Sequence, residues 1–372
     1  MATSVAKNFA KSWDMLRLLR HGGPALCNIA VTNSCNAKCN FCNFAVGKVH
    51  KHDLHWIDPE RFADALDILH RRNVRYVSFF GGEPLLHPRL PDLIGMAVAK
   101  GMGPAVITNG WRLPAKLDQL AAAGLKTVYV SIDAAAMADH EANRGLKGLG
   151  DRIRSATARM PDLGVTAFAQ VTMSKLIRDY RALAPALRDL GFTAVAFSYP
   201  QRARLGSSSL AWSDDSALVK FTDEELLEAF DAVDDLRGFI AVNNPRASIA
   251  DMKRHLRGEQ EKFACYGGYK SFYMDWNYDI WRCDAWSERL CSVWEFDHVP
   301  LVRDGCTACI ADCYRDSSVM LHFAVSIGDA LDRIGEGRIF DAVKALADRR
   351  NAASIGAIVG NAPAIARLAK LG

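Results

Sequence analysis

Short apolar segments alternate with amphipathic helical segments between residues 26 and 200, and this alternation restricts the possible folds more than any other feature. Repeated strand–helix units place their strands parallel, with right-handed crossovers. Ligands of such sheets gather at the C-terminal ends of the strands. The pattern predicts an α/β fold, as an open doubly wound sheet or a partial barrel. Six strands are expected, at residues 26–32, 74–80, 104–107, 127–132, 165–172 and 194–198.

The rest of the pattern divides the chain into five regions. Helices are expected between the strands, at residues 59–72, 88–100, 114–123, 153–160 and 180–190, and outside them at 5–20, 222–236, 248–258 and 353–370. A hairpin is expected at residues 271–276 and 280–283. The expected regions are an N-terminal helix (1–25), the strand–helix region (26–200), a lid or linker (201–262), a cysteine-rich domain (263–316) and C-terminal helices (317–372).

Composition excludes several classes of protein. Half of the 372 residues are hydrophobic, which is enough for a core and argues against disorder. Because 46 basic residues face 42 acidic ones, nothing indicates a nucleic-acid surface. The sequence shows no apolar run long enough to cross a membrane and no secretory signal at its beginning. We therefore expect a soluble, cytoplasmic protein.

The ten cysteines are bunched in a way that indicates metal binding. Three lie within residues 35–42 and three within 306–313, with none between Cys42 and Cys265. A disulfide framework is typical of short secreted chains, whereas bunched cysteines in a reducing compartment are typical of metal sites. Cys27 lies in the first expected strand and is interpreted as a small buried hydrophobe.

The segment Cys35-Asn-Ala-Lys-Cys39-Asn-Phe-Cys42 follows the first expected strand directly. Three thiolates on a short loop can hold three irons of a [4Fe–4S] cluster and leave the fourth iron open for a ligand. A structural metal knuckle is the alternative, although zinc usually takes four ligands and no fourth lies nearby. Polar motifs also follow the next three strands: Gly81-Gly82-Glu83-Pro84, Thr108-Asn109-Gly110, and Ser131-Ile132-Asp133 with the segment 140–145 (HEANRG).

In this order and at these positions, the motifs resemble those of the radical S-adenosylmethionine (SAM) superfamily. The resemblance covers residues 26–200 and implies a partial (β/α)6 barrel. It implies that Cys35, Cys39 and Cys42 hold a [4Fe–4S] cluster, with the aromatic Phe41 before the third cysteine. It also implies that Gly82 and Glu83 hold the amino group of SAM and that Arg144 contacts its carboxylate. The remaining cofactor-binding residues that it implies are Thr108, Asn109, Ser131 and Asp133.

A second set of cysteines is similar to the twitch and SPASM extensions that carry auxiliary clusters. It comprises Cys265, Cys283 and the segment Cys306-Thr-Ala-Cys309-Ile-Ala-Asp-Cys313. The tail is shorter than that of a complete SPASM domain, so we expect one auxiliary [4Fe–4S] cluster, held by Cys265, Cys283, Cys306 and Cys309, with Cys313 able to replace one of them. A structural zinc ribbon is the alternative. Cys291 is a candidate hydrogen donor to a substrate radical.

The resemblance implies an enzyme that cleaves SAM reductively to a 5′-deoxyadenosyl radical and abstracts hydrogen from a small or medium organic substrate. We expect oxidation or another C–H functionalisation, aided by the auxiliary cluster. Two alternatives remain open: addition of the radical to an alkene lipid, as in adenosylhopane synthase, and peptide modification. The implied partners are SAM, the substrate and an electron donor such as flavodoxin or ferredoxin.

Overall fold

A computed structural model describes residues 14, 16–45, 47–200 and 216–361 of the chain. The first part of the expected lid or linker (201–262), residues 201–215, lies outside these residues, and so does most of the expected first helix. Residues 16–20 of that helix are described and are helical. The last expected helix also falls partly beyond residue 361. Among the helices described, none combines the length and the apolar character that a bilayer crossing requires.

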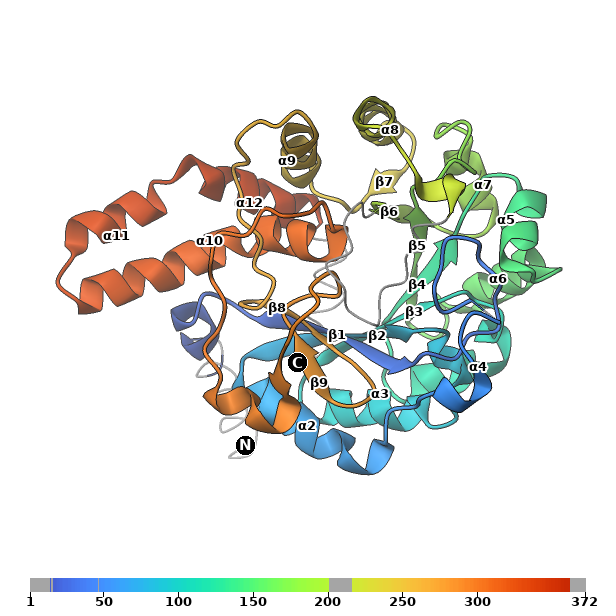
Figure 1. The fold of residues 1–372 in the computed structure, drawn as a ribbon, viewed down its shortest axis with the longest axis horizontal. Coiled ribbons are helices and arrows are strands. Elements are labelled where there is room, and N and C mark those ends of the chain that lie inside the picture. Colours follow the sequence, from blue (N-terminus) through green and yellow to red (C-terminus); the bar gives the residue numbers. More distant parts are fainter. Residues whose placement is uncertain (1–13, 15, 46, 201–215, 362–372) are drawn as a thin grey trace.

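One continuous sheet of ten strands organises the described residues, in the order β10-β9-β8-β1-β2-β3-β4-β5-β6-β7. The strands from β1 to β7 pair in parallel, and Figure 1 shows them curving into an incomplete barrel. The fold is thus an α/β partial barrel with C-terminal helices. The parallel strands are β1 (Ala25–Thr32), β2 (Val74–Gly81), β3 (Gly103–Thr108), β4 (Thr127–Ile132), β5 (Thr166–Thr172), β6 (Ala194–Ser198) and β7 (Ala241–Val242).

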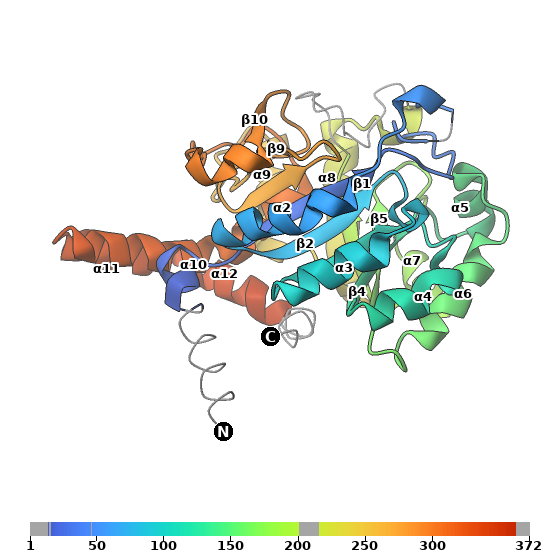
Figure 2. The ribbon, with the colours of Figure 1, turned by 90° about the horizontal axis from the view of Figure 1, so that it is seen from below.

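Helices between these strands cover the outer face of the sheet (Figures 1 and 2). Alternate residues of β4 show the two faces: Val128 and Val130 are completely buried, whereas Tyr129 and Ser131 on the concave side are half-buried. The covering helices are α2 (Pro59–Arg71), α3 (Leu90–Ala99), α4 (Leu113–Ala122), α5 (Met137–Arg144), α6 (Leu149–Arg159) and α7 (Leu183–Asp189). Short 3-10 turns occur at Lys51–Asp53, Pro84–Leu86 and Ala217–Val219.

The cysteine-rich region extends the same sheet. Strand β8 (Ser271–Met274) pairs in parallel with β1, and β9 (Asp279–Trp281) and β10 (Arg289–Ser292) continue it in antiparallel fashion. The hairpin expected near residues 271–283 is confirmed as β8 and β9, with shorter strands. Its turn is fixed by the Asp275 carboxylate, which accepts hydrogen bonds from the backbone N–H groups of Asn277 at 2.9 Å and Asp279 at 3.2 Å.

The remaining helices lie around the open side of the barrel. α8 (Asp223–Leu236) begins with a capping box between Thr222 and Glu225, and α9 (Arg246–Leu256) follows β7. A 3-10 segment, Val293–His298, precedes the three C-terminal helices. Both ribbon views show α10 (Asp312–Gly335) and α11 (Ile339–Leu346) projecting as a helical arm, with α12 (Arg349–Gly360) returning beside α10.

Candidate functional site

The cysteine loop 35–42 follows β1 directly and is held by the C-terminal ends of the neighbouring strands. The amide of Asn109, after β3, donates to the side-chain oxygen of Asn36 at 2.8 Å. The carbonyl of Arg144, at the end of α5, accepts from the N–H of Lys38 at 2.8 Å. Because β1 to β4 are parallel and adjacent, their C-terminal ends share one edge of the sheet, and the predicted motifs converge on this loop.

The glycines of the Gly81-Gly82-Glu83 turn allow two backbones to approach each other closely. The N–H of Gly82 donates to the Thr32 carbonyl and that of Glu83 to the Ser34 carbonyl, both at 2.7 Å. A Cβ atom on Gly82 would lie 2.1 Å from the Ser34 carbonyl oxygen, and Gly81 has a φ of +126° that other residues rarely adopt. These hydrogen bonds extend the pairing of β1 and β2 to the residue before Cys35.

The Glu83 carboxylate joins the turns after β2 and β3. It accepts hydrogen bonds from Thr108 Oγ1 at 2.6 Å, from Asn109 N–H at 2.8 Å and from Leu85 N–H at 3.0 Å. Burial raises the pKa of Glu83, and the three donors oppose that rise. Two carboxylate oxygens offer about four acceptor sites, so about one remains for a further donor.

A buried ion pair connects β4 to α5. Arg144 donates to both carboxylate oxygens of Asp133, from Nε at 2.9 Å and from Nη2 at 2.7 Å. Burial alone would raise the pKa of Asp133, but the charge of Arg144 and the contact with His140 hold it well below its usual range. Asn143 also donates to Asp133 at 2.9 Å. Nη1 of Arg144 makes no hydrogen bond to the described residues, and this donor stays available for a ligand.

The three thiols of this loop are close enough to influence one another electrostatically. Burial raises the pKa of Cys35 and of Cys39 to about 12, with a contribution from neighbouring thiols, and burial also raises the pKa of Cys42. The Arg144 cation opposes it at all three. Ala37 N–H approaches the Cys35 sulfur at 3.4 Å, a contact that also favours a thiolate. Three buried thiols beside a cation and backbone N–H donors suit the thiolate ligands of a cluster.

Four cysteines of the second set also lie together. The N–H of Cys265 donates to the carbonyl of Cys306 at 2.8 Å, and Cys265, Cys283, Cys306 and Cys309 pack around Ala285 and Tyr314. Their thiols influence one another electrostatically, and burial raises the pKa of Cys265 to about 12 and that of Cys309 to about 11. No three His, Cys, Asp or Glu side chains in the described part of the chain converge tightly enough for a single metal ion. In a [4Fe–4S] cluster, however, each cysteine binds a different iron.

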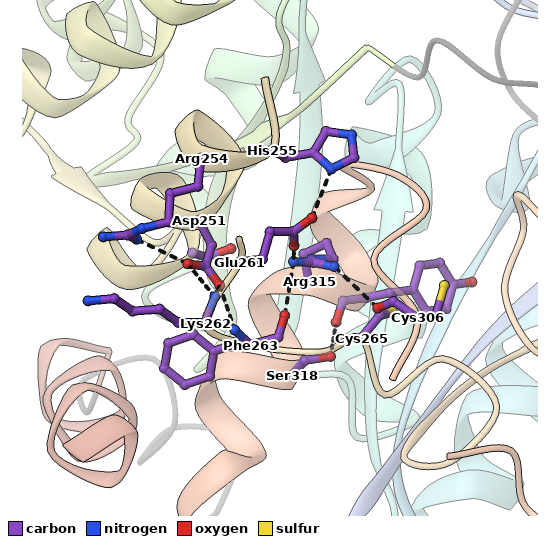
Figure 3. A network of polar contacts seen from close by, with 12 residues as sticks. Asp251, Arg254, His255, Glu261, Lys262, Phe263, Cys265, Cys306, Arg315 and Ser318 are labelled. Atoms are coloured by element: carbon purple, nitrogen blue, oxygen red, sulfur yellow. Dashed lines mark hydrogen bonds and ion pairs between the residues drawn. The ribbon is translucent and has the colours of Figure 1, made fainter. Parts of the chain in front are cut away.

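A buried polar network positions the backbone on both sides of this second set (Figure 3). Arg315 of α10 is only 2% exposed and pairs with Glu261. Its guanidinium also donates to the Phe263 carbonyl at 3.0 Å and reaches the Cys306 carbonyl at 3.5 Å. Asp251 accepts from the N–H of Phe263 at 2.7 Å. One arginine therefore connects the segment that carries Cys265 to the segment that carries Cys306.

Cys313 occupies a different position from these four. It lies in the first turn of α10, where its thiol approaches the Asp312 carboxylate at 3.6 Å. Its side chain is solvent-accessible, yet enclosure by the surrounding chain and the neighbouring carboxylates of Asp312 and Asp284 raise its pKa. Cys313 also acts electrostatically on Tyr129, on the concave side of β4. The Cys313 thiol therefore lies among carboxylates, on the side of α10 that faces the barrel interior.

The other predicted residues lie as follows. Phe41 and Cys27 are buried, the latter in β1, as expected for a small hydrophobe. Ser131 is half-buried on β4. Cys291 is buried on β10, where it pairs with Ile280, and burial raises its pKa to about 11. The charges that act on Cys291 include Arg72, which follows α2 on the outer side of the sheet, and none comes from the cysteine loop 35–42.

Sequence reasoning missed several residues that build the site. Asn36 and Asn143 hold the cysteine loop, and the buried ring of His140 accepts the N–H of Asp133 at 3.2 Å. Two of these, His140 and Asn143, belong to the same HEANRG segment as Arg144. If that segment is taken as a helix, its spacing predicts that both side chains lie near Arg144. The buried pair of Arg315 and Glu261 had no such signal, because the two residues are far apart in the sequence.

Substitution Gly82→Ala will displace the Ser34 carbonyl, because the new Cβ cannot be accommodated at 2.1 Å. We expect a loss of more than about 1 kcal/mol in the free energy of unfolding, measured by urea denaturation. Gly95→Ala on α3 is the control, since nothing lies within 4 Å of its Cβ and alanine favours a helix. Equal stability of the two variants would contradict this account of the turn.

Substitution Arg315→Leu will leave Glu261 buried without its cation, which costs about 3–5 kcal/mol in the free energy of unfolding. Arg257→Leu, at an exposed position after α9, is the matched control and is expected to cost less than about 0.5 kcal/mol. Chemical denaturation of both variants checks this. A cost for Arg315→Leu as small as that of the control would show that the network does not support the fold.

Comparison with known proteins shows which family and which relatives the region around this site resembles. The radical SAM superfamily matches residues 29–175. A GTP 3′,8-cyclase from Chlorobaculum tepidum is 37% identical over 107 residues, covering 28% of this chain and 32% of that protein. Mycofactocin maturase MftC from Mycobacterium tuberculosis is 32% identical over 148 residues, covering 40% of this chain and 36% of that protein. The alignments thus span about a third of the length of these relatives.

Solved structures share the fold. Streptococcus suis SuiB bound to its precursor peptide SuiA has a TM-score of 0.54 at 16% identity, over 77% of this chain and 65% of that chain. The enzyme anSMEcpe with bound AdoMet has a TM-score of 0.54 at 13% identity, over 84% of this chain and 99% of that chain. The expectation drawn from the strand-end motifs is confirmed for this region: residues 29–175 match the radical SAM superfamily.

Proposed function

We propose that this chain is a radical SAM enzyme that cleaves SAM reductively and abstracts hydrogen from a peptide substrate. The observation that carries the proposal is the convergence of the Gly82, Asn109 and Arg144 segments on one buried loop of three thiols. A cluster held by Cys35, Cys39 and Cys42 would supply the electron that splits the sulfonium bond and so produces the 5′-deoxyadenosyl radical.

The residues around the loop have groups that suit the amino-acid end of SAM. Glu83 retains about one acceptor site, which an ammonium group can use, and such a contact would favour its ionised form. Nη1 of Arg144 can donate to a carboxylate while Nε and Nη2 stay on Asp133. The ion pair thereby orients the guanidinium before the ligand arrives. Thr108 and Asn109 position Glu83, and we assign them an indirect role.

A peptide substrate is supported by the relatives. MftC is described as a maturase, AlbA from Bacillus subtilis as a subtilosin biosynthesis protein, and SuiB was solved with a precursor peptide. These names favour peptide modification, which the sequence left as an alternative, over a small organic substrate. They give no support to addition of the radical to a lipid.

We further propose that Cys265, Cys283, Cys306 and Cys309 hold one auxiliary [4Fe–4S] cluster. Their mutual proximity and the N–H of Gly267, 3.3 Å from the Cys265 sulfur, support this assignment. A second cluster close to the substrate could accept the electron of a substrate radical, so that the reaction would end in oxidation. We propose flavodoxin or ferredoxin as the electron donor. We also propose that the protein acts in the cytoplasm, because a reducing compartment keeps thiols free.

Anaerobic protein with dithionite and SAM is expected to release 5′-deoxyadenosine and methionine. The triple variant Cys35→Ala, Cys39→Ala, Cys42→Ala is expected to lose about four irons and all cleavage. Chromatography and iron counting measure both. The triple variant Cys27→Ala, Cys291→Ala, Gly95→Ala carries the same number of changes outside both cysteine sets and should retain its iron. Cleavage by the first variant would refute the assignment of the loop.

Two probes test the substrate. Short peptides encoded beside the gene are expected to raise the yield of 5′-deoxyadenosine and to lose hydrogen, observed by mass spectrometry. GTP serves as the second probe, because one relative is a GTP 3′,8-cyclase. Consumption of GTP in step with 5′-deoxyadenosine would contradict the peptide proposal and leave the radical SAM assignment standing.

Iron counting also tests the ligands of the auxiliary cluster. Cys309→Ser is expected to lose the auxiliary iron, because this thiol lies among the other three. Cys313→Ser is expected to retain it, because the Cys313 thiol lies with Asp312 and on the barrel side of α10. Equal iron loss in the two variants would show that Cys313 is a ligand.

A further inference from the structure

A cavity of about 510 Å³ lies where the helical arm meets the second cysteine set. One wall comes from Ala264, Cys265 and Tyr266, a second from Arg303 and Gly305, and the rest from α10, α11, α12 and the turns between them. None of the residues assigned to SAM lines this cavity, which adjoins the second cysteine set at Cys265. Its volume falls within the range of about 300–1,000 Å³ that is typical of small-molecule sites.

The residues that line the cavity carry more positive than negative charge. Three aspartates each pair with an arginine: Asp329 with Arg303 at 2.6 Å, Asp341 with Arg338 at 2.7 Å, and Asp348 with Arg350 at 2.5 Å.

Two further cations, Arg333 and Lys344, line the same cavity. Within the described ranges, neither forms an ion pair, and Arg333 donates only to the backbone carbonyl of Asp341 at 3.1 Å. Because the paired residues neutralise each other, these two cations leave the cavity with an excess of positive charge. Guanidinium and ammonium groups together suit carboxylate and phosphate oxygens.

The floor of the cavity contains a hydrogen-bonding group without a partner. His322 is 8% exposed, and its Nδ1 lies 2.9 Å from the Tyr266 hydroxyl. Either the hydroxyl or the ring nitrogen can be the donor in this contact. Nε2 is buried and has no hydrogen-bond partner in the described ranges. A buried polar atom without a partner is costly, so this group favours a polar ligand in the cavity.

We propose that this cavity binds a small organic anion that carries carboxylate or phosphate groups, held by Arg333 and Lys344 beside the Cys265 segment. The ligand would lie between the projecting arm and the cysteine-rich region and would join α10, α11 and α12 to the backbone before β8. The site is separate from the residues that are proposed to bind SAM.

The test measures binding to the complete protein in low-salt buffer, without SAM or reductant. Calorimetry with inorganic pyrophosphate and with citrate as probes distinguishes the phosphate source from the carboxylate source. We expect at least one probe to bind, and the double variant Arg333→Gln, Lys344→Gln to weaken that binding at least tenfold. The charge-preserving variant Arg333→Lys, Lys344→Arg is expected to retain most of it.

The control is the double variant Arg112→Gln, Lys116→Gln, which removes the same charge beside and on α4, on the other side of the barrel (Figure 1). Equal weakening by the control and the cavity variant would overturn the proposal, because binding would then depend on net charge alone. Absence of binding by both probes at millimolar concentration would also overturn it. Thermal unfolding of each variant shows that the comparison is made between folded proteins.

Discussion

The buried ion pair of Asp133 and Arg144 is the interaction on which the first cysteine site depends. It joins the end of β4 to α5, and the carbonyl of the same arginine holds Lys38 in the middle of the cysteine loop. A fully desolvated pair is a weak source of stability, because taking both charges out of water costs about as much as their attraction returns. Its value here is positional: it fixes one cation beside three thiols, where its charge opposes the rise in pKa that burial causes.

Much of this arrangement could be predicted from the sequence, because it follows from local pattern and a general rule. The strands β4 and β6 begin and end at the expected residues, since apolar runs between turn residues define buried parallel strands. Once the strands are parallel, motifs after consecutive strands must meet at one edge. Helix α5 was not predicted, because Met137–Arg144 is short and its side chains serve the site more than the core.

Long-range features escaped prediction. The pairing of β8 with β1 makes the cysteine-rich region part of the barrel sheet, and no local pattern specifies which edge a short strand will join. The buried Arg315 likewise reads as an exposed helical residue, because its partner Glu261 and the carbonyl of Phe263 are brought close only by the fold. Polar groups that hold distant backbone segments together depend on tertiary structure, whereas periodicity reports only which face of an element is buried.

The first turns of α10 connect the segments that follow β6 and β7 to strand β8 across the open side of the barrel. On one side, Asp312 accepts the N–H of Tyr199 after β6, and Asp316 accepts the amide of Asn244 at 2.7 Å. On the other side, Ser317 shares a hydrogen bond of 2.9 Å with Ser271 of β8. The helix thus bridges both edges of the incomplete barrel.

This bridge also determines the surroundings of the barrel interior. Burial raises the pKa of Asp312 to about 8 and that of Asp316 to about 7. The charge of Asp316 adds to the rise at Asp312, whereas hydrogen bonds from Ser248 and Asn244 oppose the rise at Asp316. Cys309 lies shortly before the start of this helix, and the Cys313 thiol in its first turn acts on Tyr129. A movement of α10 would therefore alter the second cysteine set and the barrel interior together.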